Sequence, residues 1–66
     1  MTDEILKLII TKAAALWGIT YDEALDEYQK GYFVIQESYD PVKKEYTYTI
    51  VYRKRPDFII IIEDPG

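Results

Sequence analysis

The spacing of apolar residues changes once along this 66-residue chain, close to Tyr32, and that change constrains the fold more than any other feature. Before it, apolar residues recur every three or four positions, which is typical of helices that bury one face. After it, apolar and polar residues alternate, and β-branched and aromatic residues become frequent, which is typical of strands. The pattern therefore predicts an α+β domain whose helices precede its strands.

Two helices are expected in the first half of the chain. Residues 2–17 form an amphipathic stretch, and Gly18 follows it as a residue suited to the left-handed conformation at a helix end. A second helix is expected after Thr20, which has capping-box spacing to Glu23, and Gly31 is placed to end that helix. The faces expected to be buried comprise Ile5, Leu6, Ile9, Ile10, Ala13, Leu16 and Trp17 in the first helix, and Tyr21, Ala24, Leu25 and Tyr28 in the second. Leu8 falls outside the first of these faces and is expected to contact neighbours on a second side.

Three strands are expected in the second half, at residues 32–39, 45–53 and 57–63. The segment 40–43 fits a type I turn, and two short loops indicate an antiparallel meander. Pairing Asp40 with Glu45 sets the first register, and pairing Arg53 with Asp57 across a three-residue loop sets the second. The expected fold is a two-layer ααβββ domain over residues 1–66, with both helices on one face of a three-stranded antiparallel sheet.

The sheet face turned away from the helices is predicted to be partly apolar. Its apolar end is expected to comprise Tyr32, Val34, Val51, Ile59 and Ile61. Two short helices cover only one side of a sheet, so these side chains should be exposed. Such an area is either a modest patch that a small protein tolerates or a surface that binds a second copy or another protein. The remaining alternatives are a different register or a segment of chain that wraps both faces.

The composition excludes several classes of catalytic site. The chain contains neither Cys nor His, which removes thiolate nucleophiles, Cys-based zinc sites, and the commonest general base and metal ligand. A Gly-rich phosphate loop and Ser-x-x-Lys spacing are also absent from the sequence. We therefore expect no enzymatic activity, no metal, no cofactor and no small-molecule ligand.

The formal net charge is −4, and the second predicted helix carries a cluster of acids. These residues are Asp22, Glu23, Asp26 and Glu27. They are interpreted either as a solvated helix face or as a docking face of a small acidic inhibitor or adaptor that binds a larger protein. The helix–glycine–helix arrangement resembles a DNA-binding helix-turn-helix, but acids on its second helix would repel phosphates. No nucleic-acid partner is expected.

The longest strongly apolar run, residues 58–62, is far shorter than the roughly 20 residues that cross a bilayer as a helix. The first four residues, Met1-Thr2-Asp3-Glu4, lack the basic region of a secretory signal. A soluble domain without a membrane partner is expected, cytoplasmic or of unassigned location.

The whole chain resembles computationally designed, de novo small α+β proteins. The resemblance is carried by the capped helix start Thr20-Tyr21-Asp22-Glu23-Ala24-Leu25, the turn Asp40-Pro41-Val42-Lys43-Lys44 and the alternating segment Glu45-Tyr46-Thr47-Tyr48-Thr49. In designed proteins such local signals agree with the global fold. The resemblance implies a non-catalytic scaffold whose role is to fold, with possible self-association through the sheet. The Ala13-Ala14-Ala15 run and four consecutive isoleucines depart from it, and a natural viral or archaeal origin is the alternative.

Overall fold

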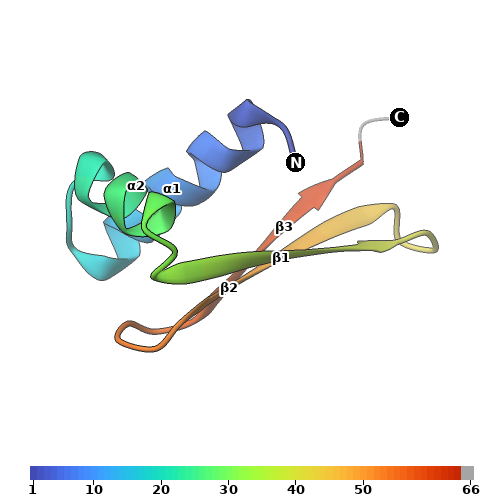
Figure 1. The fold of residues 1–66 in the computed structure, drawn as a ribbon. Helices are drawn as coiled ribbons and strands as arrows, with labels where there is room; N and C mark the ends of the chain where they lie inside the picture. Colours follow the sequence, from blue (N-terminus) through green and yellow to red (C-terminus); the bar gives the residue numbers. More distant parts are fainter. Residues whose placement is uncertain (65–66) are drawn as a thin grey trace.

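The computed structural model describes residues 1–64 and shows two helices followed by three strands (Figure 1). The elements are α1 (Asp3–Trp17), α2 (Tyr21–Gln29), β1 (Phe33–Asp40), β2 (Glu45–Tyr52) and β3 (Phe58–Glu63). The strands form an antiparallel sheet in the order β1-β2-β3, and both helices lie on one side of it. This is the predicted ααβββ arrangement. The last two residues of the predicted domain, 65–66, lie outside the described residues.

Both helices begin and end within one residue of the predicted positions. Thr2 caps α1 through its hydroxyl oxygen, which accepts the Ile5 N–H at 3.2 Å, and Gly18 ends that helix at φ 69°. The capping box of α2 is complete: the Glu23 N–H donates to the Thr20 hydroxyl at 3.1 Å, and the Glu23 carboxylate accepts the Thr20 N–H at 3.4 Å. Gly31, at φ 77°, lies one residue beyond the cap of α2.

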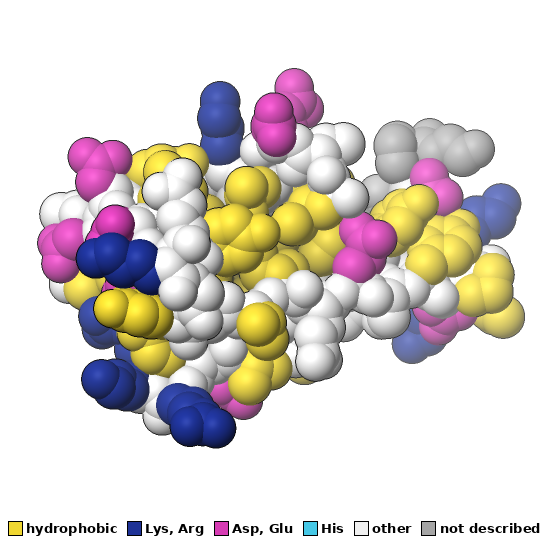
Figure 2. Space-filling model, in the orientation of Figure 1, with side chains coloured by type: hydrophobic (Ala, Val, Ile, Leu, Met, Phe, Trp, Pro, Cys, Tyr) yellow, Lys and Arg dark blue, Asp and Glu magenta, His cyan; other side chains and the backbone are white. Residues whose placement is uncertain are grey.

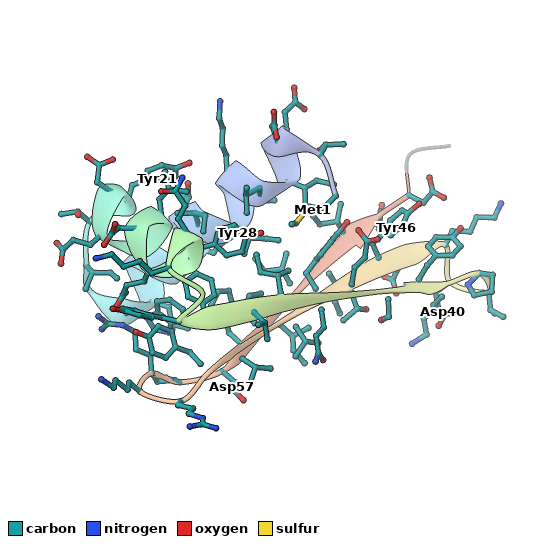
Figure 3. All side chains as sticks on the ribbon, in the orientation of Figure 1. Met1, Tyr21, Tyr28, Asp40, Tyr46 and Asp57 are labelled. Atoms are coloured by element: carbon teal, nitrogen blue, oxygen red, sulfur yellow. The ribbon has the colours of Figure 1, made fainter. Side chains whose placement is uncertain are left out.

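The core lies between the helices and the inner face of the sheet, where Figure 2 shows hydrophobic side chains gathered. Its buried members are Ile9, Ile10, Ala13, Ala14, Ala24, Phe33, Tyr48, Ile50 and Tyr52. Trp17 closes one end of the core with edge-to-face contacts to Phe33, Tyr52 and Phe58, at ring-centroid distances of 5.1, 5.3 and 5.6 Å. At the other end the sheet extends away from α2, with Asp40 and Tyr46 near its tip (Figure 3).

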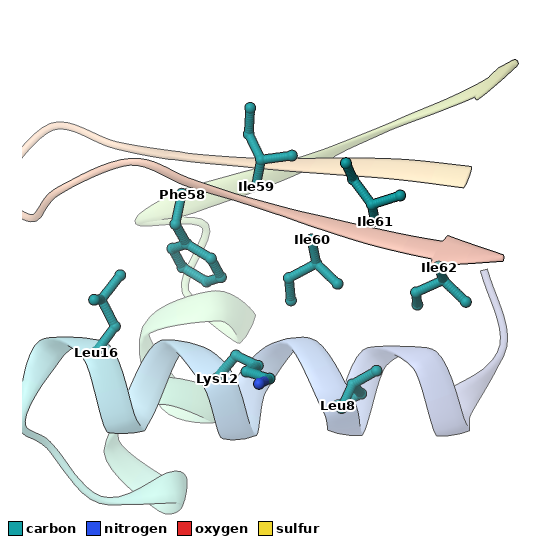
Figure 4. Close-up of a pocket in the computed structure, with 8 residues that line it drawn as sticks. All are labelled: Leu8, Lys12, Leu16, Phe58, Ile59, Ile60, Ile61 and Ile62. Carbon is teal, nitrogen blue, oxygen red and sulfur yellow. The ribbon is translucent and has the colours of Figure 1, made fainter. Parts of the chain in front are cut away.

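Two side chains expected in the core are exposed. Leu16 is 55% exposed and Tyr21, at the start of α2, is also exposed. The prediction was wrong for Leu16 because α1 lies beside β3, the last strand of the sheet, so that this side of the helix meets no further strand (Figure 4). The buried face of α1 is therefore narrower than its apolar face.

The register of β1 against β2 is the predicted one. Phe33 pairs with Tyr52, and Asp40 pairs with Glu45 at the turn. The Asp40 carboxylate accepts the N–H groups of Val42 and Lys43 at 2.9 and 3.2 Å, which holds the turn.

The predicted register of β2 against β3 is wrong by two residues. Ile50 pairs with Phe58, whereas a three-residue loop would have set it opposite Ile60. The connection is longer because the Asp57 carboxylate accepts the Tyr52 N–H at 3.2 Å instead of pairing with Arg53, and the Trp17 indole N–H donates to the Pro56 carbonyl at 3.0 Å. A shift of two residues leaves every side chain on its predicted face.

Candidate functional site

The outer face of the sheet carries the predicted apolar side chains in exposed positions. Tyr32, Val34, Val51, Ile59 and Ile61 are all exposed. The corrected register spreads them out, since Val34 pairs with Val51, whereas Ile59 and Ile61 lie beside Thr49 and Thr47. The two isoleucines therefore lie opposite the polar part of this face, and Ile59 is diagonal to Val51 instead of directly opposite it, so the apolar area is less compact than the predicted register implied.

The two isoleucines instead mark β3, which is one of the two edge strands of the sheet, β1 being the other. Within the described residues β3 pairs with β2 alone, so its other side is open. The Asp64 N–H donates to the Lys44 carbonyl at 2.8 Å, in line with the β2–β3 register. Because backbone groups alternate in direction along an antiparallel strand, residues 58, 60 and 62 then bond to β2, and Ile59 and Ile61 direct N–H and C=O outward. Their side chains are 62% and 60% exposed.

A groove of about 500 Å³ runs along the inner side of this edge, between β3 and α1 (Figure 4). Residues 58–62 form one wall, and Leu8, Lys12 and Leu16 form the other. Both leucines are exposed, and Lys12 lies between them along α1. Leu8 was expected to contact neighbours on a second side of its helix, and the structure places it at this groove. The groove itself was not predicted; the signal for it is the excess width of the apolar face of α1.

The four acids of α2 do not form one exposed face, which corrects the sequence interpretation. Glu27 lies three residues after buried Ala24, on the same side of the helix, and its side chain is only 14% exposed. Its carboxylate accepts the Tyr52 hydroxyl at 3.0 Å and pairs with Arg55 at 2.9 Å. The hydrogen bond to Glu27 raises the pKa of Arg55 above its ordinary value. The cluster therefore ties α2 to the β2–β3 turn.

The other three acids are partly engaged. Glu23 belongs to the capping box, and Asp26 forms an exposed ion pair with Lys30 at 2.9 Å, which raises the pKa of Lys30. Asp22 is exposed on the first turn. Basic side chains gather beside the β2–β3 turn, which carries Arg53, Lys54 and Arg55 (Figure 2). A second hollow, of about 190 Å³, lies there against Tyr32 and Tyr52.

Within residues 1–64, no group of three or more acidic, His or Cys side chains is placed to hold a metal ion. In that same part of the chain, no helix combines the length and the apolar character needed to cross a membrane. Comparison with protein-family models, with curated proteins and with solved structures finds no match to this chain. The β3 edge and its groove are the surface features from which a function is inferred.

Proposed function

We propose that the chain is a non-catalytic scaffold domain that binds another polypeptide along β3, one of the two edge strands of its sheet. One observation carries the proposal: Ile59 and Ile61 combine exposed apolar side chains with outward-directed backbone N–H and C=O groups. Proteins usually shield edge strands with charges, bulges or a covering segment. Within the strand sequence itself no charged residue interrupts the stretch 58–62, and Asp57 and Glu63 stand at its two ends.

An incoming strand would extend the sheet to four strands. Its backbone would hydrogen-bond with Ile59 and Ile61, and its side chains would cover both isoleucines on the outer face and the two leucines in the groove. Association at the edge is better supported than stacking of two outer faces, because Thr47 and Thr49 separate Ile59 and Ile61 from most of that face. The resemblance to designed domains supports the scaffold role.

The acidic-adaptor alternative has less support. Its docking face required four exposed carboxylates on α2, and Glu27 is instead engaged with Tyr52 and Arg55. Asp26 and Glu23 already have partners in the chain. Edge binding by a second copy and by a different protein remain two forms of the same proposal, since both use β3.

The test removes one backbone N–H donor from the β3 edge by a substitution that should leave the protein folded. Ile61→Pro eliminates the outward N–H of residue 61, and Pro is tolerated where an N–H faces away from the sheet. Ile61→Thr is the matched control, because it reduces apolar side-chain area but keeps the N–H. Random heptapeptides displayed on phage are selected on the wild-type protein, and light scattering behind size exclusion over a tenfold concentration range measures self-association.

We expect selected peptides, or a second copy, to bind the wild type and Ile61→Thr and to lose binding to Ile61→Pro. Circular dichroism checks that both variants are folded. Peptides that bind all three proteins equally, or a monomer that selects no peptide, would show that the β3 edge is not a binding surface.

A further inference from the structure

We infer that the β3 edge and its groove bind an extended segment of a different protein whose inward-facing side chains read apolar, acidic, apolar. The inference rests on the proposed edge binding and names the chemistry of the occupant. It depends on three side chains of α1 that face the groove, Leu8, Lys12 and Leu16 (Figure 4).

The spacing of these three side chains along α1 is close to the spacing of alternate side chains along a β-strand. Residues four apart on a helix rise by about 6 Å, and alternate residues of a strand, which share one face, rise by about 6.8 Å. A strand placed beside β3 would therefore present successive inward side chains to Leu8, Lys12 and Leu16. The pattern of the groove is symmetric about Lys12, so it selects the same apolar–acidic–apolar order for a parallel and an antiparallel segment.

Lys12 supplies the charge selectivity. Within residues 1–64 the ion pairs join the N-terminal amine to Glu37, Lys30 to Asp26 and Arg55 to Glu27, and none includes Lys12. Its neighbours in the groove are leucine, isoleucine and phenylalanine side chains. A carboxylate held opposite would form a charge-assisted hydrogen bond with the ammonium group, whereas a basic side chain there would be repelled.

The same lysine argues against a second copy as the occupant. Two β3 strands paired antiparallel about a twofold axis near Ile60 would bring the same groove of each copy to that axis. Because Lys12 lies at the middle of the groove, the two ammonium groups would approach one another beside apolar surface. A different chain with a central acidic side chain would be attracted to Lys12, whereas the Lys12 of a second copy would be repelled by it.

The probe is the heptapeptide Ser-Ile-Thr-Glu-Thr-Ile-Ser, acetylated and amidated, with versions that carry Gln or Lys in place of the central Glu. Binding to the ¹⁵N-labelled full chain is measured by NMR titration, which tolerates the weak affinity of a short flexible peptide. The protein variants are Lys12→Glu and, as the matched control, Lys7→Glu, which makes the same charge change at another exposed position of α1.

We expect the wild type to bind the Glu peptide about fivefold more tightly than the Lys peptide, in the range of a partly exposed ion pair. Lys12→Glu should reverse this order, and Lys7→Glu should leave it unchanged. Equal affinity for the three peptides, or equal effects of the two protein variants, overturns the inference. So does a dimer that Ile61→Pro abolishes, which would identify a second copy as the occupant while leaving edge binding intact. Failure of the proposed edge binding is a separate result: the peptides would then bind Ile61→Pro as tightly as they bind the wild type.

Discussion

Tyr48 is 1% exposed, and its hydroxyl donates to the Glu37 carboxylate at 2.7 Å. Burial, reinforced by this hydrogen bond, raises the pKa of Tyr48 to about 12. The folded state therefore keeps a proton that the unfolded chain releases above pH about 10, so the free energy of unfolding should fall between pH 10 and 12. Tyr48→Phe should lose about 1 kcal/mol at pH 7 and show a shallower decline above pH 10. Urea unfolding of both proteins across this range measures the difference, and equal slopes would contradict the assignment.

Arg55 contacts Glu27 through two nitrogens, and its guanidinium lies 5.7 Å from the ring centroids of both Trp17 and Tyr52. Arg55→Met removes the cation and leaves the mostly buried carboxylate of Glu27 with only the Tyr52 hydroxyl. We expect a clear loss of thermal stability for this variant. Arg53→Met, which removes an exposed arginine from the same turn, should cost little. Similar melting temperatures for the two variants would show that the cluster contributes nothing to folding.

Residues that act through local geometry were predictable, and residues that act through distant partners were not. The caps at Thr20 and Gly18 follow from side-chain type and spacing within one turn. Glu27 was misplaced because its partners are Tyr52 and Arg55, 25 and 28 residues away. From the sequence alone, an acidic residue among other acids on a helix is assigned to a solvent-exposed face. Only the folded structure shows that partners from other elements contact it.

Among the elements, β3 offers a sharp test of the register. Ile60 directs its N–H toward β2 and Ile61 directs its N–H toward solvent, as the β2–β3 pairing requires. Ile60→Pro should therefore cost about 3 kcal/mol or more, through a lost ladder hydrogen bond and disturbed packing, whereas Ile61→Pro should cost about 1 kcal/mol or less. Chemical denaturation measures both values. The reverse order would mean that the pairing is shifted by one residue.

The register of β3 against β2 is the part of the sheet that the sequence did not predict correctly. The β1–β2 register was predictable because Asp40 and Pro41 define a turn from adjacent residues. The β2–β3 connection lacks such a turn signal: it holds a hydrogen bond from the Tyr52 N–H to the Asp57 carboxylate and another from Trp17 to the Pro56 carbonyl, 39 residues apart. The register error was an even number of residues, which keeps each side chain on its predicted face of the sheet. The buried and exposed faces were therefore predicted correctly, although the cross-strand neighbours of Ile59 and Ile61 were not.

The groove exists only once the two layers are assembled. Sequence periodicity shows which side of α1 is apolar, but not that the helix lies beside β3 with Leu8 and Leu16 lining a groove against that strand. That placement follows from the packing of Ile9, Ile10 and Trp17 against the sheet. The candidate site was therefore predicted in part, through Ile59 and Ile61, and its α1 wall required the structure.

The two layers share one small core, and they should unfold together. Ile9 of α1 and Ile50 of β2 are both fully buried in it, so replacing either by Ala should cost roughly 2–5 kcal/mol, a large part of the stability of a domain of this size. Thr47→Ala, on the outer face, should cost much less. Helix content followed by far-UV circular dichroism and Trp17 fluorescence, which reports on contacts with the sheet, should give coincident transitions in every variant. If Ile9→Ala shifted the first signal and left the second in place, the helical layer and the sheet would be independent units, and the groove between them would not be a persistent surface.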